Sequence, residues 1–171
     1  MSWVRLGMIQ RDLGRTEEAS AALEKNLDLT RSLAKADPDS TFAQRDLAYA
    51  FAQLGGLQLA AGQFDKALVS YQRDLEISAA LAKADPGNAE LQIDLAAAYR
   101  DMAQVNQDIA SDSKRPSEDR REHWREARSW HQQCLDVNIA LRDRGELPPT
   151  DAAVPDELRG LIETCNKASG L

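Results

Sequence analysis

The sequence predicts an all-α protein of stacked antiparallel helical hairpins that form a superhelix, closed by a C-terminal capping helix. The first reason is composition: helix-favouring residues dominate the 171-residue chain, and aromatic residues make up only 5% of it. The second is internal repetition. The segment LAKADP begins at Leu33 and again at Leu81, 48 residues later, and the 16-residue windows that start there share ten identities. A fixed period of this size is typical of a repeat architecture.

Each repeat contains two helices separated by turn residues. Apolar residues follow helical spacing over Ser40–Ala61, stop at Gly62 and resume over Phe64–Ala84. Pro86 then ends the second helix because proline cannot continue one, and Asn88 is a good N-cap for the next helix, as Ser40 is in the preceding copy. Because both connections are short, we expect the two helices to be antiparallel.

The period divides the chain into three copies and a tail. We assign the copies to residues 1–38, 39–86 and 87–144, and residues 145–171 to a linker and a capping helix. The second helix of the last copy matches the others only at an offset of 60, so twelve residues are inserted near 111–121. Since the inserted segment is polar and contains a proline, we predict a solvent-exposed loop there.

The repeated positions carry a family resemblance. An aromatic residue, Leu and Gly occur in the first helix, Gly at the turn, and a small residue followed by an aromatic one in the second helix. This pattern resembles the tetratricopeptide repeat (TPR) family, in a variant with long helices similar to those of large bacterial signalling proteins. The positions that carry the resemblance are Phe51, Leu54, Gly55, Gly62, Ala67 and Tyr71.

The two ends of the chain indicate the kind of larger protein to which it could belong. Only two residues precede Trp3, whereas about ten helical residues precede the matching aromatic position in the other copies, so we expect the chain to be the tail of a longer protein. Near the other end, the segment Trp124–Cys165, with its LRDRGELPP, resembles the C-terminal end of some bacterial receptor-type Ser/Thr kinases with TPR tails. Within it, DELRGLIETC predicts an amphipathic capping helix whose apolar residues are Leu158, Leu161, Ile162 and Cys165.

The TPR resemblance implies a function in protein interaction. The first helices of such hairpins line a concave groove that accepts an extended peptide or a partner helix. The positions that would line this groove are Val4, Met8, Arg11, Asp12, Tyr49, Ala52, Gly56, Leu59, Arg100, Gln104, Gln107 and Asp108. Family members that bind chaperone tails hold a carboxylate with Lys and Asn, but here the matching positions are Val4, Met8, Ala52 and Gly56, so a carboxylate specificity is not expected.

No combination of residues indicates catalysis. Glycine-rich phosphate loops, kinase signatures and a GxSxG sequence are missing, so we predict no enzyme activity and no cofactor. The strongest candidate for a metal site is His123, His131 and Cys134, which zinc accepts as ligands. However, His131 occupies the position of Leu23 and Tyr71 in the other copies, so we interpret it as a core residue and predict no metal. Cys134 and Cys165 are read as buried apolar side chains.

Charge narrows the choice of partner. A net charge of −7 argues against broad binding of nucleic acid or anionic membrane, and no apolar run has the roughly 20 residues of a membrane span. We therefore predict a cytoplasmic, non-catalytic scaffold with a protein or peptide partner. Two alternatives remain open: a sensor or docking tail of a larger signalling enzyme such as a Ser/Thr kinase, and self-association through the N-terminal end at Trp3 and Leu6.

Overall fold

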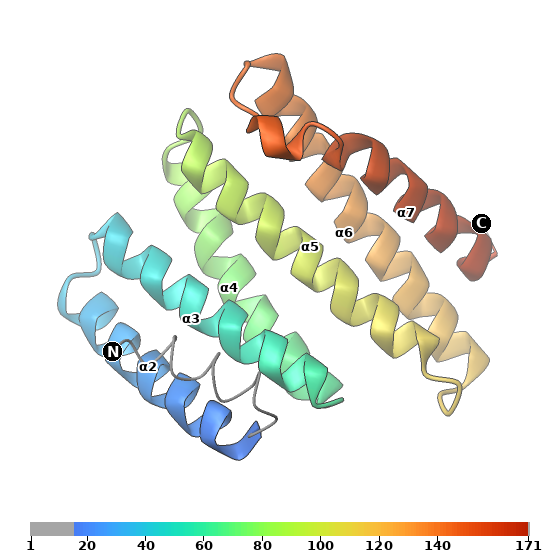
Figure 1. Cartoon of the computed structure of the whole chain (residues 1–171), viewed down its shortest axis with the longest axis horizontal. Helices are drawn as coiled ribbons and strands as arrows, with labels where there is room; N and C mark the ends of the chain where they lie inside the picture. The colour runs from blue at the N-terminus through green and yellow to red at the C-terminus, as the bar shows by residue number, and fades with distance from the viewer. Residues whose placement is uncertain (1–15, 171) are drawn as a thin grey trace. The chain divides into compact units, whose positions relative to one another are not determined.

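A computed structural model describes residues 16–170, and these residues fold almost entirely into helices (Figure 1). The prediction of an all-α fold is confirmed, since residues 16–170 contain no β-strand. One short 3-10 helix, η1 (Pro149–Asp151), precedes the last α-helix. The α-helices are α2 (Thr16–Ala36), α3 (Thr41–Ala60), α4 (Phe64–Ala84), α5 (Ala89–Ser111), α6 (Ser117–Asp143) and α7 (Val154–Ser169).

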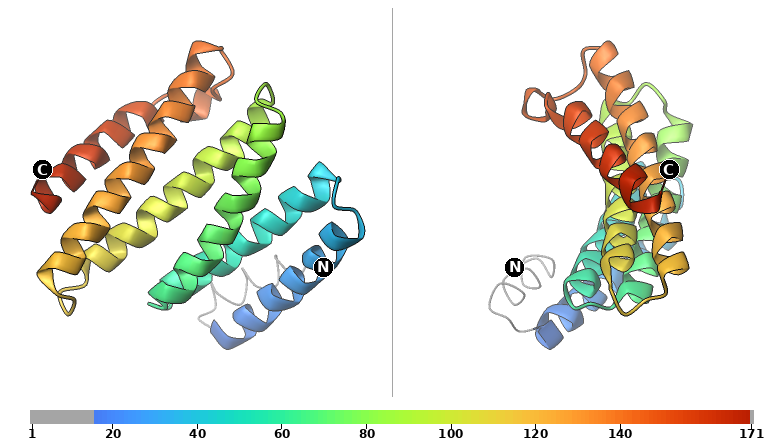
Figure 2. Two further views of the ribbon diagram at one scale, coloured as in Figure 1. Left: turned by 180° about the vertical axis from the view of Figure 1, so that it is seen from behind. Right: turned by 90° about the vertical axis from the view of Figure 1, so that its right-hand side faces the viewer.

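The described part of the chain divides into two compact units, whose boundary falls within α4, between Ser78 and Ala79. In the first unit α2 packs along α3, and in the second unit α6 packs against both α5 and α7. The two views of Figure 2 show α7 lying along α6. Neighbouring helices within each unit therefore form antiparallel hairpins, as the sequence predicts. The repeat boundaries at residues 38, 86 and 144 stay predictions.

The two Asp-Pro turns hold equivalent hydrogen bonds. Ser40 caps α3 by accepting a hydrogen bond from the Ala43 amide, and Asn88 caps α5 by accepting from the amides of Glu90 and Leu91. In addition, Gln92 Nε2 donates to the Ala82 carbonyl oxygen at 3.1 Å, across the turn. Both predicted N-caps are thus confirmed, and each turn is fixed by side-chain as well as backbone bonds.

Of the predicted insertion loop near residues 111–121, the structure places residues 112–116 between helices and the rest within α5 and α6. Of the twelve inserted residues, three extend α5 to Ser111, two lengthen the connection between the helices, and seven lengthen α6 at its start. The physical reason is that Pro116 stands just before α6, where a proline is tolerated, and the acidic residues Glu118 and Asp119 favour a helix N-terminus. A polar, charged segment is therefore helical here.

The C-terminal helix α7 packs on the last hairpin, as expected of a capping helix. Leu158, Ile162 and Cys165 are buried, and the first two belong to one core cluster with Cys134 and Leu135 of α6. Leu161 is different from the expectation, because 37% of its surface is exposed. Consecutive residues of an α-helix are rotated by about 100° around its axis. Leu161 therefore lies away from the buried face that Ile162 occupies.

Candidate functional site

Helix α3 has one buried and one open side. Its buried side is formed by Ala50, Leu54 and Leu57, which share a core cluster with Ala19, Leu23 and Leu27 of α2. The predicted groove residues lie on other positions of the same helix. Half of the Tyr49 side chain is exposed (50%), and Ala52, Gly56 and Leu59 are partly buried. The sequence therefore separates packing positions from accessible positions on α3.

Of the two glycines in the middle of α3, only Gly55 lies in close contact with α4. A Cβ atom at Gly55 would lie 2.8 Å from two ring carbons of Tyr71, a separation that real Cβ atoms do not show. Tyr71 is itself buried. A Cβ atom at Gly56 would lie 3.5 Å from the Tyr71 hydroxyl oxygen, an ordinary contact. Gly55 is thus a packing residue, while the predicted groove residue Gly56 has room beside it.

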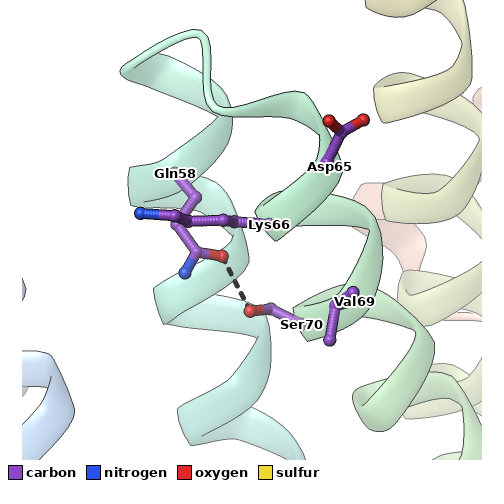
Figure 3. Close-up of a pocket in the computed structure, with 5 residues that line it drawn as sticks. All are labelled: Gln58, Asp65, Lys66, Val69 and Ser70. Atoms are coloured by element: carbon purple, nitrogen blue, oxygen red, sulfur yellow. Dashed lines mark hydrogen bonds between the residues drawn. The ribbon is translucent and has the colours of Figure 1, made fainter.

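A shallow pocket lies where α3 and α4 approach their shared turn. It has a volume of about 390 Å³, and Figure 3 shows the residues that line it: Gln58, Asp65, Lys66, Val69 and Ser70. Across it Ser70 Oγ donates to Gln58 Oε1 at 2.7 Å, so these two polar groups satisfy each other. None of the predicted groove residues lines this pocket, so the predicted surface and the pocket are separate features.

The predicted groove residues of α5 differ in whether their side chains already have hydrogen-bond partners among the described residues. Gln104 Nε2 donates to Asp108 Oδ1 at 2.9 Å, and Gln107 Nε2 donates to Cys165 Sγ at 3.6 Å, which links α5 to α7. Arg100 is exposed, and within residues 16–170 it makes no hydrogen bond or ion pair. Arg100 is therefore the cation on α5 that a partner could reach.

Two neighbours of these residues were not predicted. Phe42 of α3 is 73% exposed and precedes Tyr49 by seven residues, so the helical spacing of the sequence could have revealed it. Asp101 follows Arg100, and burial raises the pKa of this carboxyl to about 6, against the opposing effect of the Arg100 charge. No sequence pattern indicated that Asp101 would be desolvated. The remaining predicted groove residues, Val4, Met8, Arg11 and Asp12, lie outside the described residues, as do Trp3 and Leu6.

A family model for the tetratricopeptide repeat matches residues 2–32. This segment therefore resembles a tetratricopeptide repeat, and the packing of successive helices on one another is consistent with a TPR-like helical repeat. No curated protein gives a significant match to it. The long helices that the sequence predicts are present in the structure, with lengths of 20 to 27 residues for α2 to α6.

The two histidines and two cysteines of the chain lie in its second unit. His131 is a core residue as predicted: it is 2% exposed, and burial lowers the pKa of its imidazole. Among residues 16–170, neither of its ring nitrogens has a hydrogen-bond partner. His123 instead contacts Asn106 Oδ1 through Nδ1 at 2.8 Å, near the start of α6. Within residues 16–170, no three His, Cys, Asp or Glu side chains are grouped so that they could hold a metal ion.

The cysteines and one tryptophan have packing roles. Cys134 and Cys165 are buried free thiols, in agreement with their interpretation as apolar side chains. Trp130 stacks on Tyr99 of α5, with ring centroids 5.9 Å apart.

No helix among the described residues is long and apolar enough to cross a membrane.

Proposed function

We propose that the chain is a non-catalytic interaction module that binds an extended peptide or a partner helix on the open side of α3 in its first unit, with the open side of α5 in its second unit as a separate surface. The observation that carries this proposal is the half-exposed Tyr49 on α3. It is a large aromatic side chain on a helix whose other side packs on α2 through Ala50, Leu54 and Leu57. Exposed aromatic residues are favoured at binding sites because a large, fairly rigid side chain loses little entropy when it is covered.

The second support comes from α5, where Arg100 is an exposed cation without an internal partner in the described part of the chain. Tyr49 and Arg100 therefore give the two helices different chemical character, one aromatic and one cationic. TPR-like proteins act as scaffolds for partner proteins, and this property of the family supports the same interpretation. A non-catalytic role also fits the sequence, which has no catalytic motif.

The test is selection of a displayed library of random dodecapeptides on the whole chain. The Kd of the best peptide is then measured by fluorescence anisotropy for the wild type, Tyr49→Ala and Arg100→Glu. We expect selected peptides with micromolar Kd values, and a loss of affinity of at least about five-fold for one or both variants. Leu161→Ala, which removes an exposed apolar side chain of α7, is the matched control and should bind like the wild type. If both variants bind the peptides as tightly as this control, the first helices are not the binding surface.

A further inference from the structure

The open side of α3 combines two exposed aromatic rings with a carboxylate. Phe42, Asp46 and Tyr49 follow one another at intervals of four and three residues, so they lie along one side of the helix. Phe42 is 73% exposed and Tyr49 is 50% exposed, while Asp46 is partly buried. The two rings are separated by about 10 Å along the helix axis, with Asp46 between them.

Among residues 16–170, no cation balances the charge of Asp46. Within residues 16–170 it makes no hydrogen bond or ion pair. Arg45, the neighbouring residue, is engaged in an interaction of its own. Arg31, the arginine that α2 directs towards α3, lies over the Phe51 ring at 5.8 Å and pairs with Asp28. Among the described residues, a partly buried carboxylate therefore lies between two exposed rings on this side of α3.

We infer that this side of α3 binds a Lys or Arg side chain of a partner protein segment. The carboxylate of Asp46 would pair with the cation, and the faces of Phe42 and Tyr49 attract a cation through their ring quadrupoles. The net charge of −7 favours the approach of a basic segment over long range. This inference rests on the proposed function and specifies the chemistry of the partner at one of its two helices.

The equivalent positions of α5 show that the arrangement is particular to α3. Shifted by the 48-residue period, Phe42 and Tyr49 become Glu90 and Ala97, so both rings are missing. Asp46 becomes Asp94, which has an interaction of its own. The α5 copy keeps the carboxylate but not the aromatic pair, and within residues 16–170 Asp94 has an interaction whereas Asp46 has none. A packing role shared by all copies therefore does not account for Phe42 and Tyr49.

The test uses a labelled hexa-arginine peptide and a labelled hexa-glutamate peptide with the whole chain, by anisotropy at about 150 mM salt, where long-range attraction is screened. We expect binding of the arginine peptide only. Asp46→Asn should raise its Kd about five-fold, and Phe42→Ala and Tyr49→Ala should each raise it about three-fold. Glu163→Gln on α7 removes the same charge at an exposed position and should leave the Kd unchanged.

Three results would overturn the inference. These are equal effects of Asp46→Asn and Glu163→Gln, preferential binding of the glutamate peptide, or no binding of the arginine peptide. The library selection then separates this inference from the proposed function. If selected dodecapeptides still lose affinity with Tyr49→Ala but lack Lys and Arg, the binding surface is correct and its preference for a cation is wrong. If no peptide is selected either, both fail.

Discussion

The ring of Tyr71 on α4 lies against the backbone of Gly55 on α3, so closely that a Cβ atom at Gly55 would be 2.8 Å from its Cδ1 and Cε1 atoms. The ring is buried and has little freedom to move aside. The neighbouring glycine, Gly56, would place a Cβ atom at 3.5 Å from the Tyr71 hydroxyl. The approach of the two helices thus depends on one glycine and not on the other.

Gly55→Ala should destabilise the protein, although alanine is the better helix former. The gain in helix propensity is about 1 kcal/mol, whereas overpacking of a buried ring costs about 1–3 kcal/mol. We expect a net loss of about 1 kcal/mol in the free energy of unfolding, measured by urea denaturation. Gly56→Ala is the matched control. It should keep the propensity gain and leave the protein equally or more stable, and equal destabilisation by both substitutions would contradict this account.

Gln92→Ala should weaken the turn between α4 and α5. The Gln92 side chain donates a hydrogen bond to the Ala82 carbonyl oxygen at 3.1 Å, and its loss leaves that acceptor without this partner. We expect a loss of about 1 kcal/mol in the free energy of unfolding. Gln104→Ala removes a hydrogen bond on the exposed surface of α5 and should change stability by less than about 0.5 kcal/mol. If the two substitutions have the same effect, the turn bond contributes nothing specific.

His131 should make the protein sensitive to acid. Its pKa is lowered by burial in the folded state, so the unfolded chain binds a proton more readily. The free energy of unfolding therefore falls as the pH drops below the usual range of histidine, and it is unaffected above that range. His131→Leu should lose less stability than the wild type between about pH 7.5 and pH 5.

The opposing effect of Asp101 is common to both proteins in that comparison. Its pKa is raised to about 6, so the folded state binds this proton more readily and gains stability as the pH falls. Because Asp101 is present in the wild type and in His131→Leu, its contribution cancels in the difference between them. If the free energies of unfolding of the two proteins change with pH in the same way, burial does not lower the pKa of His131 as we expect.

The two thiols should be protected in the folded protein. Burial raises the pKa of Cys134 to about 11 and also raises the pKa of Cys165, so neither is a thiolate at pH 8. We expect a disulfide reagent to label both at least about 100-fold more slowly in the native protein than in urea. Rapid labelling of either cysteine under native conditions would mean that α6 and α7 separate readily.

Much of the fold could be predicted because turn residues act locally. Gly62 adopts a left-handed conformation with φ of 69°, and the predicted caps Ser40 and Asn88 accept the expected amide hydrogen bonds. These features depend on backbone geometry over only a few residues, so the residue types at the turns predict them directly. The equivalence of His131 with Leu23 and Tyr71 likewise predicted its burial, because a repeat places equivalent residues in equivalent surroundings.

The secondary structure of the inserted segment is harder to predict, because composition alone does not distinguish a charged loop from a charged helix. Arg115 pairs with Asp119 at 3.2 Å, four residues later, and this spacing is compatible with the helix that forms there. Phe42 was missed for another reason. Its position has no aromatic equivalent in the other copies, so comparison of the repeats did not select it, although its spacing from Tyr49 was visible. The desolvation of Asp101 depends on packing between helices and has no local signature.

The most direct test of the central claim is to map where a selected dodecapeptide contacts the whole chain, by chemical-shift changes in isotope-labelled protein. The account predicts that the largest changes fall on the open side of α3, at Phe42, Tyr49 and Ala52, with smaller changes at Arg100 of α5. Changes concentrated at the pocket around Ser70 or on α7, with α3 unaffected, would contradict it.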